Sequence, residues 1–119
     1  MIFIVDDDAP TRDSLRLLLE VKGFEAREFA DGRAFLDIER PAEGDCLILD
    51  LTMPGMNGFE VLAELRGRGD GLPVIIVTAH ADSATRSRAA ADGALAVIEK
   101  PHRACELFAL VGRALGIGL

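Results

Sequence analysis

Short apolar runs alternate along the chain with longer stretches in which apolar residues recur three and four positions apart. Five runs predict strands, because β-branched and other apolar residues fill them and turn residues follow them. They are Ile2–Val5, Phe24–Phe29, Cys46–Leu49, Pro73–Val77 and Leu95–Ile98. A stretch with helical spacing follows each of them. The pattern therefore predicts five successive β-α units.

The predicted helices are identified by their apolar stripes and by the residues at their ends. The first has Pro10 in its first turn and ends at Gly23, the usual places for these two residues. The other stripes are Ala34, Phe35 and Ile38 before Pro41; Phe59, Val61, Leu62 and Leu65 after the Asn57-Gly58 turn; the polar-alanine segment Ser83–Ala91; and Leu107, Leu110, Val111, Ala114 and Leu115.

This alternation predicts an α/β fold, a parallel sheet with helices on both faces, because right-handed crossovers place them there. The runs 2–5, 46–49 and 74–77 are apolar throughout, as strands buried on both faces are. The run 24–29 alternates apolar and polar residues, which predicts an edge strand. With 119 residues, the chain is expected to form one domain, 1–119.

Composition narrows the classes of partner. A formal net charge of −7 argues against binding of DNA or an anionic membrane by this domain, since phosphate would be repelled. No apolar run reaches the roughly 18 residues that a membrane span needs. Cys46 and Cys105 lie in no metal-binding spacing and are predicted to be buried free thiols. Free thiols indicate a reducing compartment, so a cytoplasmic location is expected.

One stretch contains an acid where a core strand should be apolar. In "LILDLTMPGMNG", residues 47–58, a buried run ends on Asp50 and the chain then turns. Asp6 and Asp7 follow the first strand in the same way, Thr78 ends the fourth, and Lys100 follows the fifth. Because ligands of parallel sheets bind at the carboxyl ends of the strands, we expect these side chains to share one cleft.

The negative charges of three carboxylates in one cleft repel one another and must be offset. Two unit charges about 4 Å apart interact by roughly 1 kcal/mol in water and about 4 kcal/mol at an effective dielectric of 20. Either a raised pKa or a cation is therefore expected, and oxygen ligands suit Mg²⁺. Two alternatives are a carboxylate pair acting as general acid and base, and a solvated Asp6–Asp8 loop that caps the next helix. The placement of Asp50, Thr78 and Lys100 at other strand ends favours the shared site.

The segments "IVDDD", "LILDLTMPGMNGFEVL", "VIIVTAH" and "VIEKP" together resemble the receiver domain of two-component response regulators, most closely the nitrogen-fixation regulator type. The resemblance spans nearly the whole chain. It implies the (βα)5 doubly wound, flavodoxin-like or CheY-like fold with strand order 2-1-3-4-5. It also implies a sensor histidine kinase as partner and a switch that controls an output such as transcription. The domain would only phosphorylate and dephosphorylate itself, and would not otherwise be an enzyme.

The resemblance assigns roles to individual residues. It makes Asp50 the phosphoacceptor that attacks a phosphohistidine. Mg²⁺ would be held by Asp7 directly, Asp6 through water, Asp50, and the backbone carbonyl of Thr52. The Thr78 hydroxyl would hydrogen-bond the phosphoryl group, and Lys100 would pair with it. The resemblance also implies a cis peptide at Lys100-Pro101.

Three positions depart from the family pattern. Receivers usually carry an aromatic residue on the fifth strand three before the lysine, and Val97 stands there, so a ring-swing switch is not expected. His102 replaces a common Phe, and His80 lies two residues past Thr78. Both histidines are interpreted as solvent-facing loop residues. An alternative is that His80, which titrates near neutral pH, tunes dephosphorylation by placing or blocking water.

Docking surfaces follow by analogy with receivers. The kinase would contact the helix Thr11–Leu19 and the loops near Pro54. A homodimer could form through the 83–114 face. There, charged pairs across the dimer would involve Arg86, Arg88 and Arg103 with Asp82, Asp92 or Glu99. Each exposed pair contributes about 0–1 kcal/mol, so these pairs would stabilise a dimer only weakly.

Two rival functions use the same residues. A haloacid-dehalogenase-like phosphatase also employs an aspartate nucleophile with Mg²⁺, but it requires a second Asp two residues on, and Thr52 is there instead. A degenerate receiver would only bind proteins. The intact set of three acids, Thr78 and Lys100 argues against it, although Val97 leaves that alternative open.

Overall fold

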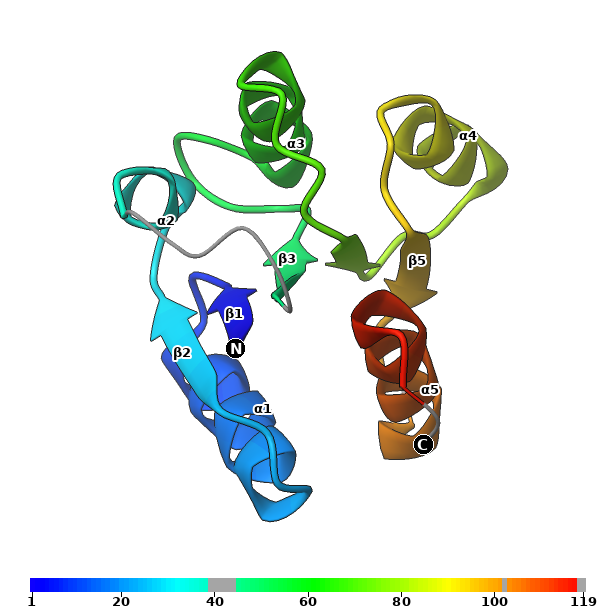
Figure 1. The fold of residues 1–119 in the computed structure, drawn as a ribbon. Coiled ribbons are helices and arrows are strands. Elements are labelled where there is room, and N and C mark those ends of the chain that lie inside the picture. Colours follow the sequence, from blue (N-terminus) through cyan, green and yellow to red (C-terminus); the bar gives the residue numbers. More distant parts are fainter. Residues whose placement is uncertain (39–44, 102, 118–119) are drawn as a thin grey trace.

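The computed structural model describes residues 1–38, 45–101 and 103–117, and these form a parallel sheet between two layers of helices (Figure 1). The strands are β1 (Ile2–Val5), β2 (Ala26–Phe29), β3 (Cys46–Asp50), β4 (Val74–Thr78) and β5 (Ala96–Glu99). The helices are α1 (Ala9–Val21), α2 (Gly32–Leu36), α3 (Gly58–Gly67), α4 (Ser83–Ala91) and α5 (Ala104–Leu115).

The strand order is β2-β1-β3-β4-β5, which confirms the doubly wound fold implied by the resemblance. Every neighbouring pair in the sheet is parallel. The three central strands are buried along their whole length, and β2, with its alternating pattern, lies at one edge. The apolar pattern therefore identified the three central strands and one of the two edge strands correctly.

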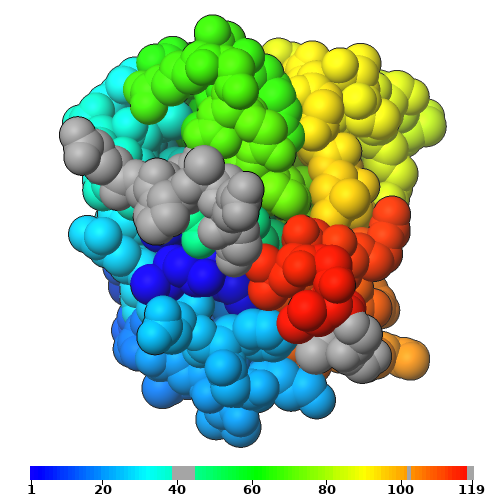
Figure 2. Space-filling view, in the orientation of Figure 1, coloured from blue at the N-terminus to red at the C-terminus, as the bar shows by residue number. Residues whose placement is uncertain are grey.

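Each face of the sheet has its own hydrophobic core. Helices α2, α3 and α4 cover one face, and α1 and α5 cover the other (Figure 1). Alternate residues of each central strand point to opposite faces, so Phe3 and Val5 join the first core whereas Ile2 and Ile4 join the second. In the space-filling view, α3 and α4 lie side by side at the top of the molecule and α5 lies below them (Figure 2).

Several boundaries differ from the sequence-based prediction. Strands β3 and β4 continue through Asp50 and Thr78, because ladder hydrogen bonds involve the backbone and continue past a polar side chain. Strand β2 begins at Ala26 because the Phe24 amide still donates to Leu19 at the end of α1. Helix α2 ends at Leu36, before Ile38, and Pro41 lies outside the described residues.

The loops at the carboxyl edge of the sheet are held by helix caps. The side chains of Asp8, Asp31, Asn57 and Asp82 accept backbone hydrogen bonds at the starts of α1 to α4, as helix N-caps do. These caps fix how each loop leaves its strand, and thus where the strand-end side chains point.

The cysteines and the helix lengths test two further expectations. Cys46 is a buried free thiol, and its burial raises the pKa of the thiol to about 12. Cys105 is also free but exposed, so the prediction of burial was wrong for it, because it lies on the outer face of α5.

Among the described residues, none of the helices combines the length and the apolarity that crossing a bilayer requires.

Candidate functional site

Three carboxylates converge where β1 and β3 end. Asp6, Asp7 and Asp50 each place one oxygen within 4.8 Å of the other two. Asp6 and Asp50 are buried, at 5% and 7% exposure, whereas Asp7 faces solvent. The structure thus brings together the predicted acids, two of them away from water.

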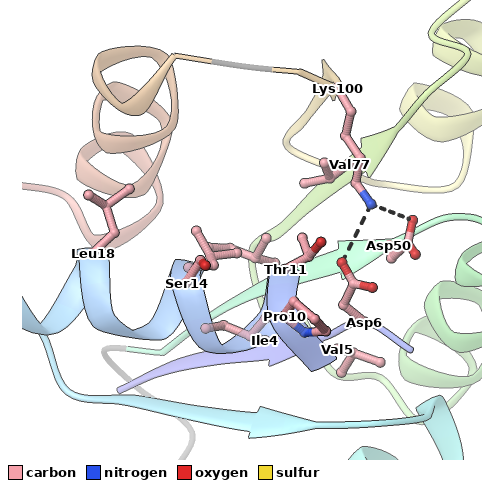
Figure 3. A pocket seen from close by; sticks show the side chains of 12 residues that line it. Ile4, Val5, Asp6, Pro10, Thr11, Ser14, Leu18, Asp50, Val77 and Lys100 are labelled. Atoms are coloured by element: carbon pink, nitrogen blue, oxygen red, sulfur yellow. Dashed lines mark hydrogen bonds and ion pairs between the residues drawn. The ribbon is translucent and has the colours of Figure 1, made fainter. Parts of the chain in front are cut away.

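Lys100 lies between the two buried acids (Figure 3). Its Nζ is 3.4 Å from Asp6 Oδ2 and 3.5 Å from Asp50 Oδ1. It reaches them from the loop after β5, and its own backbone amide donates to the Thr78 carbonyl at 2.8 Å. One ammonium therefore touches residues from β1 and β3 while its backbone is tied to β4.

The electrostatics of the cluster are unbalanced. Burial, followed by repulsion from Asp6, raises the pKa of Asp50 to about 6, while the Lys100 ammonium opposes the rise. A single lysine thus does not offset the negative charge of the acids. A hard divalent cation with oxygen ligands, such as Mg²⁺, fits this set of donors, because each carboxylate already presents an oxygen toward the others.

The acidic loop after β1 is held at several points around Asp6. Its carboxylate Oδ1 accepts from the Asp8 amide at 2.9 Å. Its backbone amide donates to Phe29 on β2 at 3.2 Å, and its carbonyl accepts from Arg12 Nη1 at 2.8 Å. Sequence reasoning did not find Arg12. Its place in the first turn of α1 was a weak signal, because its contact with the loop depends on how the chain turns from β1 into α1.

The backbone around Asp50 is packed tightly. The Thr52 amide donates to Asp50 Oδ1 at 3.4 Å. Gly58, the first residue of α3, lies against this segment: a Cβ there would come within 2.8 Å of the Asp50 carbonyl oxygen and of the Leu51 Cα. A glycine is needed here for close approach, whereas the sequence pattern predicted only a turn at Asn57-Gly58. The role of the Thr52 carbonyl as a metal ligand stays a prediction.

Thr78 ends β4 as a buried hydroxyl residue at 3% exposure. Its Oγ1 accepts a hydrogen bond from the His80 amide at 3.2 Å, and the His80 side chain is exposed, in agreement with a solvent-facing loop position. The Lys100-Pro101 peptide is cis, which confirms the expectation from the resemblance. His102 lies outside the described residues.

A cavity of about 400 Å³ adjoins the carboxylates (Figure 3). Its polar end is formed by Asp6, Asp50 and Lys100, and α1 contributes Thr11, Ser14 and Leu18 to its wall. Apolar side chains of β1, β3 and β4 form its floor. The phosphoacceptor candidate is therefore buried but can be reached from this side.

The arginines of α4 bond within their own chain. Arg86 donates to the Ala81 carbonyl at 3.1 Å and to the Val97 carbonyl at 3.0 Å. The Arg88 guanidinium lies 4.0 Å from the centroid of the Phe59 ring and 3.8 Å from the Asp92 carboxylate. These contacts reduce what both side chains could offer to a dimer, which stays a prediction.

Comparison with known proteins gives a consistent result. A family model described as the response regulator receiver domain matches residues 2–112. The transcriptional regulatory protein FixJ of Azorhizobium caulinodans is 36% identical over 115 residues, which cover 97% of this chain and 54% of FixJ. Response regulator MprA of Mycobacterium tuberculosis is 40% identical over 109 residues, covering 91% of this chain and 47% of MprA.

The structural comparison extends the similarity to three dimensions. The crystal structure of FixJ-N matches with a TM-score of 0.85 at 32% identity, covering 99% of this chain and 94% of that one. The chain spans about half the length of the two curated relatives.

Proposed function

We propose, from the premise that this chain belongs to the family of response regulator receiver domains, that Asp50 accepts a phosphoryl group from the phosphohistidine of a sensor histidine kinase. Receiver domains are regulatory parts of two-component systems, and as a family they interact with such kinases. The single observation that carries the proposal is the position of Lys100, in contact with both Asp6 and Asp50 at the acidic cluster.

The transfer needs an ionised, accessible carboxylate. An Asp50 oxygen attacks phosphorus, the bond from phosphorus to the imidazole nitrogen breaks, and the imidazole keeps the electron pair. Lys100 lies close enough to Asp50 to stabilise the negative charge that develops on the phosphoryl oxygens. The Thr78 hydroxyl, at the adjacent strand end, donates to a phosphoryl oxygen of the product.

The family binds Mg²⁺ in general, and the acidic cluster has the donors for it. Asp6, Asp7, Asp50 and the carbonyl of Thr52 would hold the ion here, with Asp6 acting through water. When bound, Mg²⁺ supplies charge neutralisation for the transferring group. Burial of Asp6 and Asp50 strengthens this effect, because water screens the charges less in a buried site.

Phosphorylation would act as a switch through Thr78. A new bond from its hydroxyl to the phosphoryl group pulls on the loop after β4, which the His80 amide already ties to Thr78. With valine at position 97, the change passes to the α4–β5 region without rotation of a ring. The output is regulation of transcription, as the name of the FixJ relative suggests, carried by the whole protein, with residues 1–119 as its receiver domain.

The partner surfaces are proposed as well. The kinase docks over α1 and the loops near Pro54, close to the cavity beside Asp50. A homodimer through the 83–114 face would bring two outputs together. The domain itself contacts neither nucleic acid nor membrane, consistent with its net charge of −7.

Incubation with acetyl phosphate and Mg²⁺ tests the proposal. One acid-stable, base-labile phosphate per chain is expected, and Asp50→Asn should not acquire it. Continuous hydrolysis of external phosphate esters would indicate a phosphatase instead. A chain that gains no phosphate would be a degenerate receiver that only binds proteins.

A further inference from the structure

Arg12 connects the acidic loop to the edge of the sheet. Its Nη1 donates to the Asp6 carbonyl at 2.8 Å, and its Nε donates to Glu28 Oε1 on β2 at 3.0 Å. Both members of the Arg12–Glu28 pair are largely buried, with side chains 16% and 17% exposed. The planar guanidinium thus holds two partners at once, which the single ammonium of a lysine does less well.

The bond from Arg12 falls on a particular peptide unit. The Asp6 carbonyl belongs to the peptide that links Asp6 to Asp7, so fixing its oxygen fixes the plane from which both side chains leave. Both are carboxylates of the acidic cluster. Since like charges favour separation of the acids, a bond that restrains this plane opposes their spreading.

Glu28 has a second partner on α1. Arg16, one turn further along α1, also bonds to Glu28, and it pairs with Glu20 at 2.6 Å. Arg16 has no contact with the acidic loop among the hydrogen bonds and ion pairs of the described residues. The two arginines therefore share a partner and a charge but differ in the contact with Asp6.

We propose that Arg12 is a positioning residue for the divalent cation: it holds the Asp6–Asp7 peptide against β2 through Glu28, so that the carboxylates stay arranged for binding. The inference rests on the proposed function, in which these acids bind Mg²⁺. Residues that orient metal ligands commonly change metal affinity by roughly 10- to 100-fold when they are replaced.

The sign of the effect separates positioning from simple electrostatics. Arg12 is a cation near an acidic cluster, and on charge alone its removal would strengthen binding of Mg²⁺. Loss of positioning would weaken it. Arg12→Gln therefore gives opposite results under the two explanations, and Arg16→Gln, which removes the same charge from the same helix, is the matched control.

Titration calorimetry of the whole chain with MgCl₂ is the experiment. Arg12→Gln should bind Mg²⁺ roughly tenfold more weakly than the parent chain. Arg16→Gln should stay within about twofold, because Arg12 still holds both Glu28 and the Asp6 carbonyl. Arg12→Lys, which keeps the charge and one partner, should fall between them. Phosphorylation by acetyl phosphate should require more Mg²⁺ in Arg12→Gln and approach the parent rate at saturation.

The outcomes are distinguishable. Binding by Arg12→Gln that equals or exceeds the parent would overturn the inference and leave the metal site intact, as would equal weakening by Arg16→Gln. Absence of Mg²⁺ binding in the parent chain would overturn the metal site and the inference with it. Circular dichroism checks the folding of each variant, and if Arg12→Gln does not fold, Arg12→Lys against Arg16→Lys decides the matter.

Discussion

Asp50→Asn is expected to make the metal-free domain more stable at neutral pH. Asparagine has nearly the shape of aspartate but carries no charge, so it resembles the protonated acid. In the folded chain the charged form of Asp50 is disfavoured, first by burial and then by the Asp6 carboxylate, and Lys100 only partly compensates. Removal of the charge relieves this cost, although it also removes the ion pair with Lys100.

The magnitude follows from proton linkage. Folding raises the pKa of Asp50 from its ordinary value of 3.8 to about 6. An acid with a raised folded pKa destabilises the fold as pH rises, because the unfolded chain loses its proton first. This destabilisation is nearly absent below pH 3.8, grows between pH 3.8 and about pH 6, and reaches its full size above about pH 6. This difference between the unfolded and folded pKa corresponds to about 3 kcal/mol at pH 7.

Urea unfolding followed by circular dichroism measures the effect. Without divalent ions at pH 7, the unfolding free energy of Asp50→Asn should exceed that of the parent by about 3 kcal/mol, equivalent to roughly 10 °C in Tm. At pH 4 the difference should fall below about 1 kcal/mol. Glu25→Gln changes the net charge equally at an exposed position and should stay within about 0.5 kcal/mol of the parent.

Two results would refute the reasoning. Equal stability of Asp50→Asn and the parent at pH 7 would mean that the Asp50 charge is already compensated in the folded, metal-free chain. A gain of the same size at pH 4 and pH 7 would mean that packing or hydrogen bonding, not charge, is responsible.

Three further predictions concern the metal, the backbone behind Asp50 and the phosphate. Millimolar Mg²⁺ should raise the Tm by mass action, and Asp7→Asn should reduce this rise; equal melting with and without Mg²⁺ would count against the metal site. Gly58→Ala should destabilise the chain by about 1–3 kcal/mol, because its Cβ would meet the Asp50 backbone. Gly67→Ala, in the same helix with open space around it, should be stabilising by about 0.5–1 kcal/mol, and a similar loss at both positions would contradict the contact. His80→Ala should change the phosphate lifetime, longer if the imidazole places water and shorter if it blocks water, and an unchanged lifetime would remove the role.

Much of the site was predictable because its residues interrupt a simple pattern. Asp50 stands out at the end of a buried apolar run, and parallel strands bring such ends to one edge whatever their order. The strand order itself came from the resemblance, since alternation alone allows several arrangements. The structural neighbours support the same order.

The details that the sequence did not predict depend on contacts between elements. The ends of β3 and β4 follow backbone pairing, which the side-chain pattern does not record. Arg86 on α4 donates to the Val97 carbonyl on β5, although its charge had suggested a partner in a second chain.

By itself, then, the amino-acid sequence determined the alternation of strands and helices, the buried central strands and the residues at their carboxyl ends, because apolar periodicity is a local property. Only the tertiary structure decided the raised pKa of Asp50, the contact of Lys100 with two acids and the link from Arg12 to Asp6. The first two depend on residues that are far apart in the sequence and that the crossover connections bring together. The third depends on how the chain turns from β1 into α1. Electrostatic and hydrogen-bond energies change steeply with such distances.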